Sequence, residues 1–124
     1  MSFNEDLRDR TKKLVITIIG FYRTFPKTEE ARIIGKQILR SATSVGANFR
    51  AACRGRSDNE YFAKLCIVVE ELDETLFWLE IIKETNLLKS EQTNLIIAES
   101  EEILKILSVT KKNAKNRLLK KKEN

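Results

Sequence analysis

Four carboxylates in one short stretch are the residues that most resemble a chemical site: Glu70, Glu71, Asp73 and Glu74. Helical bundles that bind metals with carboxylates usually add histidines in a Glu-x-x-His pattern. The chain contains no histidine, so it lacks these partners and also the commonest general base of enzymes. We therefore interpret the carboxylates as a salt-bridged or solvated helix face, and we expect neither a metal ion nor a cofactor.

The two cysteines are the other candidates for chemistry. Cys53 and Cys66 stand singly in apolar surroundings, which is typical of buried, unreactive thiols and fits a cytoplasmic protein. A disulfide framework or zinc site would need more partners or closer spacing, and the chain has no Gly-rich phosphate loop. We predict no catalytic residues and no enzyme.

The elements that carry these residues are predicted to be helices, because only four Gly and one Pro interrupt 124 residues. The first helix should run from an N-cap at Asn4 to Pro26, and the second should begin after an N-cap at Thr28. Gly20 interrupts the first helix and would fit a close helix crossing. The apolar stretch 14–22 is too short for a membrane span, which needs about 20 residues, so we expect no membrane association.

A run of eight small residues, 41–48, lies in the second helix. Ser, Thr, Asn and Gly are poor helix formers, but the apolar spacing passes through the run without losing phase, so we predict that it is helical. Small side chains would let another helix approach closely here. The turn that follows contains Gly55, which suits a left-handed conformation, and Ser57 with Glu60, which form a capping-box pattern.

The third helix should follow that turn, and the fourth should begin after Ser90 and reach about Lys111. The connecting turns are short, which favours antiparallel neighbours. We therefore predict an all-α fold, an antiparallel up-down-up-down four-helix bundle over residues 5–111. Residues 112–124 should form a basic C-terminal tail, either a frayed helical extension or a disordered arm.

The net charge of +5 is unevenly distributed along the chain. Residues 1–56 hold 12 Lys and Arg against 5 Asp and Glu, a net charge of +7. Residues 57–110 hold 4 against 12, or −8, and residues 111–124 hold 7 against 1, or +6. This pattern indicates complementary surfaces between helices or subunits and a separate basic arm.

The basic segments supply the candidates for contact with nucleic-acid phosphates. They lie on the second helix, in the turn after it and in the tail: Arg40, Arg50, Arg54, Arg56, Lys111, Lys112, Lys115 and Arg117.

A second stripe on the third helix, beside its apolar heptad, mixes charge with apolar bulk and includes the only Trp; its members are Lys64, Ile67, Glu71, Thr75, Trp78 and Ile82. It is either a subunit interface or a broad core face. With the polar members of the small-residue run, it gives these candidate interface residues: Ser41, Ser44, Asn48, Lys64, Glu71, Glu74 and Trp78. For the small-residue run, tight packing alone remains the alternative to direct partner contact.

Two segments, QILRSATSVGANFRAACRGRS at residues 37–57 and FAKLCIVVEELDETLFWLEII at residues 62–82, resemble a known family. They are similar to the bacterial four-helix-bundle proteins encoded within intervening sequences of 23S ribosomal RNA genes. The same broad fold occurs in the accessory variability determinants of diversity-generating retroelements. The resemblance implies a bundle that assembles as a homopentamer and has a nucleic-acid-related role; in the retroelement relatives the bundle binds RNA and a reverse transcriptase.

The chain departs from the family pattern at two positions. Ala51 stands where many members have Glu, and Glu70 stands where many have Lys. The second change makes the third helix more acidic, so the second helix and the tail become the better candidates for phosphate contact. We expect a non-enzymatic homo-oligomer that binds RNA or DNA. The alternative is a structural bundle that binds another protein, such as a reverse transcriptase; a small-ligand or metal-binding bundle is a third reading.

Overall fold

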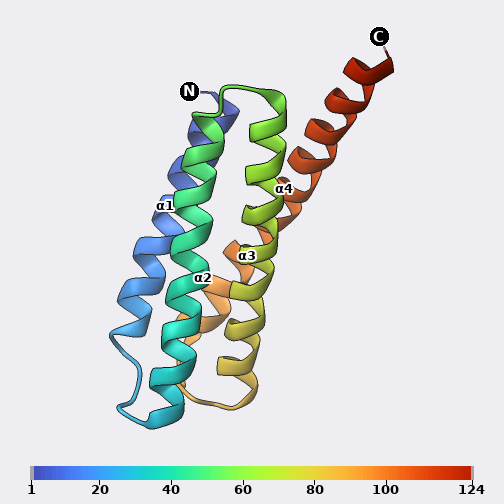
Figure 1. Ribbon diagram of the computed structural model, residues 1–124. Helices are drawn as coiled ribbons and strands as arrows, with labels where there is room; N and C mark the ends of the chain where they lie inside the picture. Colours follow the sequence, from blue (N-terminus) through green and yellow to red (C-terminus); the bar gives the residue numbers. More distant parts are fainter. Residues whose placement is uncertain (1, 124) are drawn as a thin grey trace.

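A computed structural model describes residues 2–123, which form four helices and no strand. The helices are α1 (Phe3–Tyr22), α2 (Glu29–Cys53), α3 (Asp58–Glu84) and α4 (Glu91–Glu123). Each helix packs against its neighbours in sequence, and α1 also packs against α4. Successive helices run in opposite directions (Figure 1). The predicted all-α, up-down-up-down four-helix bundle is confirmed.

The ends of α1 differ from the sequence-based expectation. The N-cap is Ser2, whose hydroxyl accepts a hydrogen bond from the backbone N–H of Glu5 at 3.1 Å. Asn4, the expected cap, lies inside the first turn, where its side chain accepts a hydrogen bond from the Tyr61 hydroxyl instead. The helix ends at Tyr22, ahead of the expected limit at Pro26.

The start of α2 and its path through the small residues are as predicted. Thr28 caps the helix by accepting from the Ala31 N–H at 3.2 Å, and α2 continues without a break to Cys53. Close packing occurs at Gly46, where an added Cβ would lie 2.8 Å from Cγ2 of Val15 on α1. The expectation for Gly20 was wrong, because nothing lies within 4 Å of a Cβ built there.

The turn between α2 and α3 keeps its predicted cap but not its predicted backbone. Ser57 accepts from the Glu60 N–H at 3.1 Å, and the Glu60 carboxylate accepts from the Arg56 N–H at 2.7 Å. Gly55 does not have a positive φ, so the left-handed prediction was wrong. The positive φ among non-glycine residues 2–123 belongs to Asn86, at 53°, in the turn before α4.

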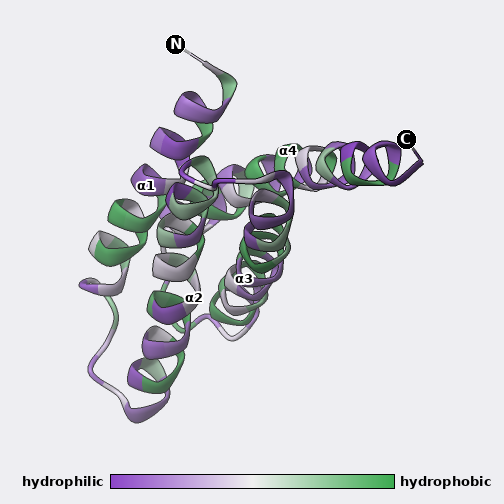
Figure 2. Ribbon diagram, turned by 45° about the horizontal axis from the view of Figure 1, so that its top comes forward, coloured by the Kyte–Doolittle hydropathy of each residue, from purple (hydrophilic) through white to green (hydrophobic). Residues whose placement is uncertain are grey.

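The core is a continuous apolar interior to which all four helices contribute. Figure 2 shows hydrophobic and hydrophilic stretches alternating along the four helices. Two members of the mixed stripe on α3, Thr75 and Ile82, are fully buried in the core. The broad-core alternative therefore holds for these two positions.

α4 shows the helical-extension alternative for the basic tail. It continues past Lys111 as one helix to Glu123, and its last part extends beyond the other three helices (Figure 1). Ala114 is still buried, at 1% exposure, so α4 packs against the bundle one heptad further than Leu107. Residues 112–123 are thus helical, and the first turn of this segment, which contains Ala114, packs against the bundle.

Candidate nucleic-acid interface

A groove between α1 and α2, with a volume of about 390 Å³, is lined by four cationic side chains. We call it the α1/α2 groove. It forms where Gly46, with no side chain, lets α1 approach α2 near Val15. Its walls are lined by Arg8, Asp9, Lys12, Val15, Thr43, Gly46, Ala47, Arg50 and Arg54.

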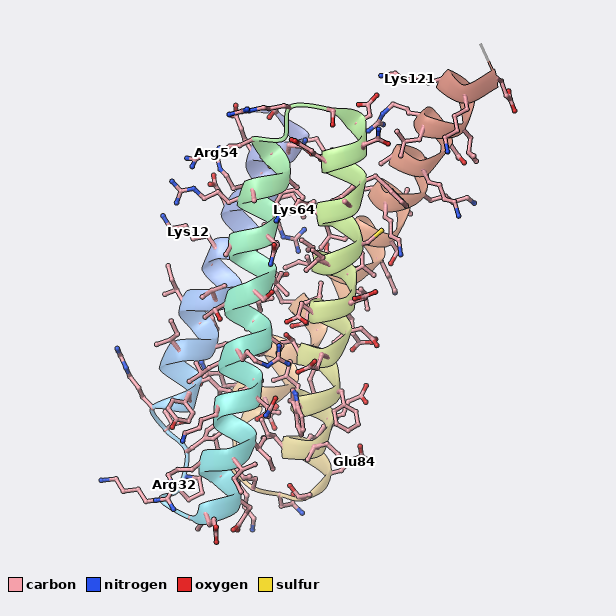
Figure 3. All side chains as sticks on the ribbon, viewed as in Figure 1. Lys12, Arg32, Arg54, Lys64, Glu84 and Lys121 are labelled. Carbon is pink, nitrogen blue, oxygen red and sulfur yellow. The ribbon has the colours of Figure 1, made fainter. Side chains whose placement is uncertain are left out.

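Two pairs of cations define the charge of this groove. Arg8 and Lys12 are one turn apart on α1, and Arg50 and Arg54 are one turn apart at the end of α2. Residues four positions apart lie on the same face of a helix, so each helix presents a pair to the groove. Figure 3 shows Lys12 and Arg54 extending outward on the same side of the bundle. The lining carboxylate is Asp9, 3.8 Å from Arg8.

The sequence-predicted cations do not gather at one place. Arg50 and Arg54 line the α1/α2 groove, and Arg56 is exposed in the following turn. Arg40 lies apart from them, because its guanidinium pairs with the carboxylates of Glu71 and Glu74 on α3.

The tail residues gather along α3 and α4. Lys111, Lys112 and Lys115 line a smaller groove of about 290 Å³, together with Ser108 and the half-buried Phe62 and Val69. We call this the α3/α4 groove. Two further cations tie α4 to the start of α3. The Arg117 guanidinium carbon lies 5.8 Å from the centre of the Tyr61 ring, and Lys121 pairs with Asp58.

Of the candidate interface residues, Ser41 is not on the surface. It has no exposed area, and its hydroxyl lies 2.8 Å from that of Thr75 in a buried hydrogen bond between α2 and α3. Ser41 therefore serves packing inside one chain, which is the alternative left open for the small-residue run.

Ser44, Asn48 and Lys64 form a half-buried polar network between α2 and α3. The Asn48 amide donates to the Ser44 hydroxyl at 2.9 Å and to the Ser44 carbonyl at 3.0 Å. Lys64 donates to the Asn48 side-chain oxygen at 3.5 Å. Lys64 lies in the space between the two helices in Figure 3.

Glu71, Glu74 and Trp78 form the other part of this surface. The Trp78 indole N–H donates to Glu74 at 3.1 Å, and Glu74 also accepts from Arg40. These donors, with Trp78 first, lower the pKa of Glu74 below its ordinary value. A charged Glu74 thereby fixes the orientation of a half-buried Trp78 beside Arg40.

The described residues contain no group of three His, Cys, Asp or Glu placed to hold a metal ion. Cys53 and Cys66 are free and partly buried. Burial raises the pKa of the Cys53 thiol, which disfavours the reactive thiolate. Within residues 2–123, no helix is long and apolar enough to span a membrane.

Sequence reasoning missed Arg8 and Lys12. They are one turn apart on the polar side of α1, and that spacing was available as a signal. What the sequence did not show is that Gly46, like Gly35, lies tightly against α1, whereas Gly20 has no such close neighbour.

Comparison with known proteins agrees with the sequence resemblance. Residues 5–109 match the 23S rRNA-intervening sequence protein family. A solved structure of a protein with unknown function from the S23 ribosomal protein family of Bacteroides thetaiotaomicron has 34% sequence identity and a TM-score of 0.79, covering 86% of this chain and 98% of the other. No curated protein matches the chain significantly. Since the family match spans most of its length, this chain belongs to the 23S rRNA-intervening sequence protein family.

Proposed function

We propose that this chain is a non-enzymatic accessory protein that binds structured RNA as a homo-oligomer. The observation that carries the proposal is the α1/α2 groove, where four cations from two helices face one hollow that has a single carboxylate in its lining. Phosphate contacts by Lys and Arg supply most of the sequence-independent affinity for nucleic acid. Arginine also suits phosphate geometry because its planar guanidinium forms paired hydrogen bonds.

The cations that face the acidic half of the bundle are already paired. Arg10 lies 2.6 Å from Glu99 and 3.3 Å from Glu102, and Arg40 pairs with two glutamates of α3. The lining of the α1/α2 groove contains none of these carboxylates. The cations of the groove are the better phosphate ligands, because binding there breaks no ion pair between helices.

Assembly into an oligomer would place several copies of the α1/α2 groove in one particle. We propose the homopentamer that the family resemblance implies, with the surface of Ser44, Asn48, Lys64, Glu74 and Trp78 at or near the contact between copies. Copies of one groove around a ring bind a long polyanion with an avidity far above that of a single site. The expected setting is the cytoplasm of a bacterium.

The test is binding to a structured RNA at increasing salt. Arg50→Glu should lower the affinity and flatten the plot of log affinity against log salt, by about one unit of slope per lost phosphate contact. Arg32→Glu is the matched control, since it makes the same charge change at the opposite end of α2, where Arg32 is exposed (Figure 3). A folded protein that fails to bind RNA even at low salt, or equal effects of the two variants, would refute the proposal.

A protein-interaction bundle is the second candidate, and one observation favours it. Phe77 on the acidic helix α3 is 50% exposed, beside Asp73 and Glu80 in a hollow between α3 and α4. An exposed aromatic ring within a charged rim is typical of a protein contact. A partner such as a reverse transcriptase would then bind through α3, and Phe77→Ala would weaken that binding without changing RNA affinity.

The assembly itself is tested by light scattering. Trp78→Ala or Glu74→Arg should shift the particle toward monomer, because both variants disrupt the ordered surface around Arg40. Leu95→Ala, at a 70% exposed position on α4, is the control for loss of a surface apolar group. If the mass of the Trp78 variant does not change, this surface is not the subunit contact.

A further inference from the structure

A hollow of about 920 Å³ on the described surface has no role in the function proposed above. It lies between the start of α1, the start of α3 and the part of α4 that leaves the bundle. We call it the N-terminal cleft. Its lining includes Phe3, Tyr61, Ile106, Val109, Asn113 and Arg117.

The cleft exists because α4 diverges from α1. These two helices have the sparsest contact of the four neighbouring pairs, and Figure 2 shows the start of α1 and the end of α4 pointing in different directions. Large apolar groups are left uncovered as a result: Phe3 is 58% exposed and Val109 is 59% exposed. Exposed apolar groups gathered in one hollow mark a binding surface.

The charge around the cleft selects the class of occupant. Lys105 and Arg117 belong to the lining, and the lining contains no carboxylate. The helical extension that starts there is also basic, with 7 Lys and Arg against 1 acidic residue in 111–124. The same extension from a second copy would therefore be repelled, although Leu119 on it is 48% exposed. An anionic occupant is favoured.

The groups inside the cleft narrow the choice further. Two aromatic rings, Phe3 and Tyr61, come from different helices, and the Arg117 guanidinium lies against the Tyr61 ring. Aromatic rings and guanidinium planes are the surfaces on which unpaired bases stack. Asn4 and Asn113 add amides that both donate and accept hydrogen bonds, as base edges require. An acidic peptide would use the charge but not this combination.

We propose that the N-terminal cleft binds unpaired nucleobases of the RNA whose phosphates the basic surfaces hold. This inference rests on the proposed function. The α3/α4 groove, with Lys111, Lys112 and Lys115, begins on the same stretch of α4 and offers the adjacent phosphates a place to bind. The protein would thereby prefer loops and single-stranded stretches over continuous duplex.

The test separates bases from phosphates. Two fluorescent probes of equal length, about 12 nucleotides and so within the usual range of single-strand sites, are titrated by anisotropy at low salt. One is an oligouridylate and the other is the same ribose-phosphate chain without bases. Wild type should bind the oligouridylate about 10-fold more tightly, as expected for stacking of one or two bases.

The variants locate the effect. Phe3→Ala and Val109→Asp should each remove most of the preference for the probe with bases, whereas Phe3→Trp should keep it. Leu95→Ala is the control, since it removes an exposed apolar group elsewhere on α4. All four changes are at exposed positions, so circular dichroism should show an unchanged fold.

The outcomes are distinct. Equal affinity of wild type for the two probes, or equal loss on both probes in Phe3→Ala, overturns the cleft proposal and leaves phosphate binding in place. Binding of neither probe overturns this proposal and the RNA-binding function together. A Phe3-dependent affinity for an acidic amphipathic peptide, with no difference between the probes, would assign the cleft to a protein partner and also overturn the proposal.

Discussion

Replacing Gly46 and Gly20 by alanine tests whether close approach of α1 and α2 shapes the α1/α2 groove. Both glycines lie inside helices and neither has a positive φ. Alanine is favoured over glycine in a helix by about 1 kcal/mol, so this gain is common to both variants. The difference in the free energy of unfolding between the two variants therefore reports on the contacts of the new methyl group alone.

The methyl groups meet different surroundings. At Gly20 nothing lies within 4 Å of the added Cβ, so Gly20→Ala should stabilise the protein by about 0.5–1 kcal/mol. At Gly46 the Cβ would lie 2.8 Å from Val15 Cγ2 and 3.6 Å from the Thr11 carbonyl oxygen. Valine is stiff in a helix, and such overpacking costs about 1–3 kcal/mol. Gly46→Ala should therefore be less stable than Gly20→Ala by about 1–3 kcal/mol.

Urea denaturation followed by circular dichroism measures this difference, at one protein concentration because assembly also contributes to stability. The slope with urea should be the same in both variants. Adding Val15→Ala to Gly46→Ala removes the clashing methyl and should recover part of the lost stability. If Gly46→Ala stabilises the protein as much as Gly20→Ala does, α1 does not approach α2 through Gly46, and the argument for the shape of the groove fails.

Three further predictions concern single contacts. Ser41→Ala and Thr75→Val should each lower the free energy of unfolding by about 1 kcal/mol, and the double variant by less than the sum, because both break one buried hydrogen bond. Emission of the only Trp should titrate with a midpoint below the ordinary glutamate pKa of about 4.3. The contact between Trp78 and Glu74 is stabilising above that range and is lost as the pH falls through the lowered pKa, so Glu74→Gln should abolish the titration. Asp58→Asn removes the ion pair with Lys121 and should speed amide hydrogen exchange in the last turns of α4. High salt should have the same effect on the wild type, because this ion pair is exposed and therefore screened by salt. Unchanged exchange would show that the ion pair does not hold the end of α4.

The helices of this bundle could be predicted because apolar spacing is a local property. In α1 the buried residues Leu7, Thr11, Leu14, Ile18 and Phe21 follow the alternating spacing of four and three residues that marks one helix face. The helical path of α2 through its small residues was predicted for the same reason. The spacing of apolar residues continues through this run, although the small residues themselves are poor helix formers.

The prediction of where two helices approach each other closely was less successful, because it depends on the distance between helices and not on local sequence. Gly20 and Gly46 look alike in sequence, and only the packing of α1 on α2 tells which one permits close approach. For the tail, the sequence left a helical extension and a disordered arm as alternatives, although Ala114 continues the spacing of Ile103 and Leu107. A single alanine among many lysines was too weak an apolar signal to decide between these two alternatives from the sequence.

The net charge of each segment indicated the cations available for phosphate contact less well than the ion pairs in the structure do. The positive first half and negative middle do not cancel uniformly, because ion pairs form only where helices face each other. Arg10 and Arg40 meet carboxylates of α4 and α3, whereas neither Arg50 nor Arg54 forms an ion pair within residues 2–123. The α1/α2 groove therefore has a local excess of cations, four against one carboxylate, which the net charge of +5 for the whole chain does not reveal. For the same reason, reversing the charge of Arg40 should chiefly loosen the bundle, whereas reversing that of Arg50 should chiefly weaken RNA binding.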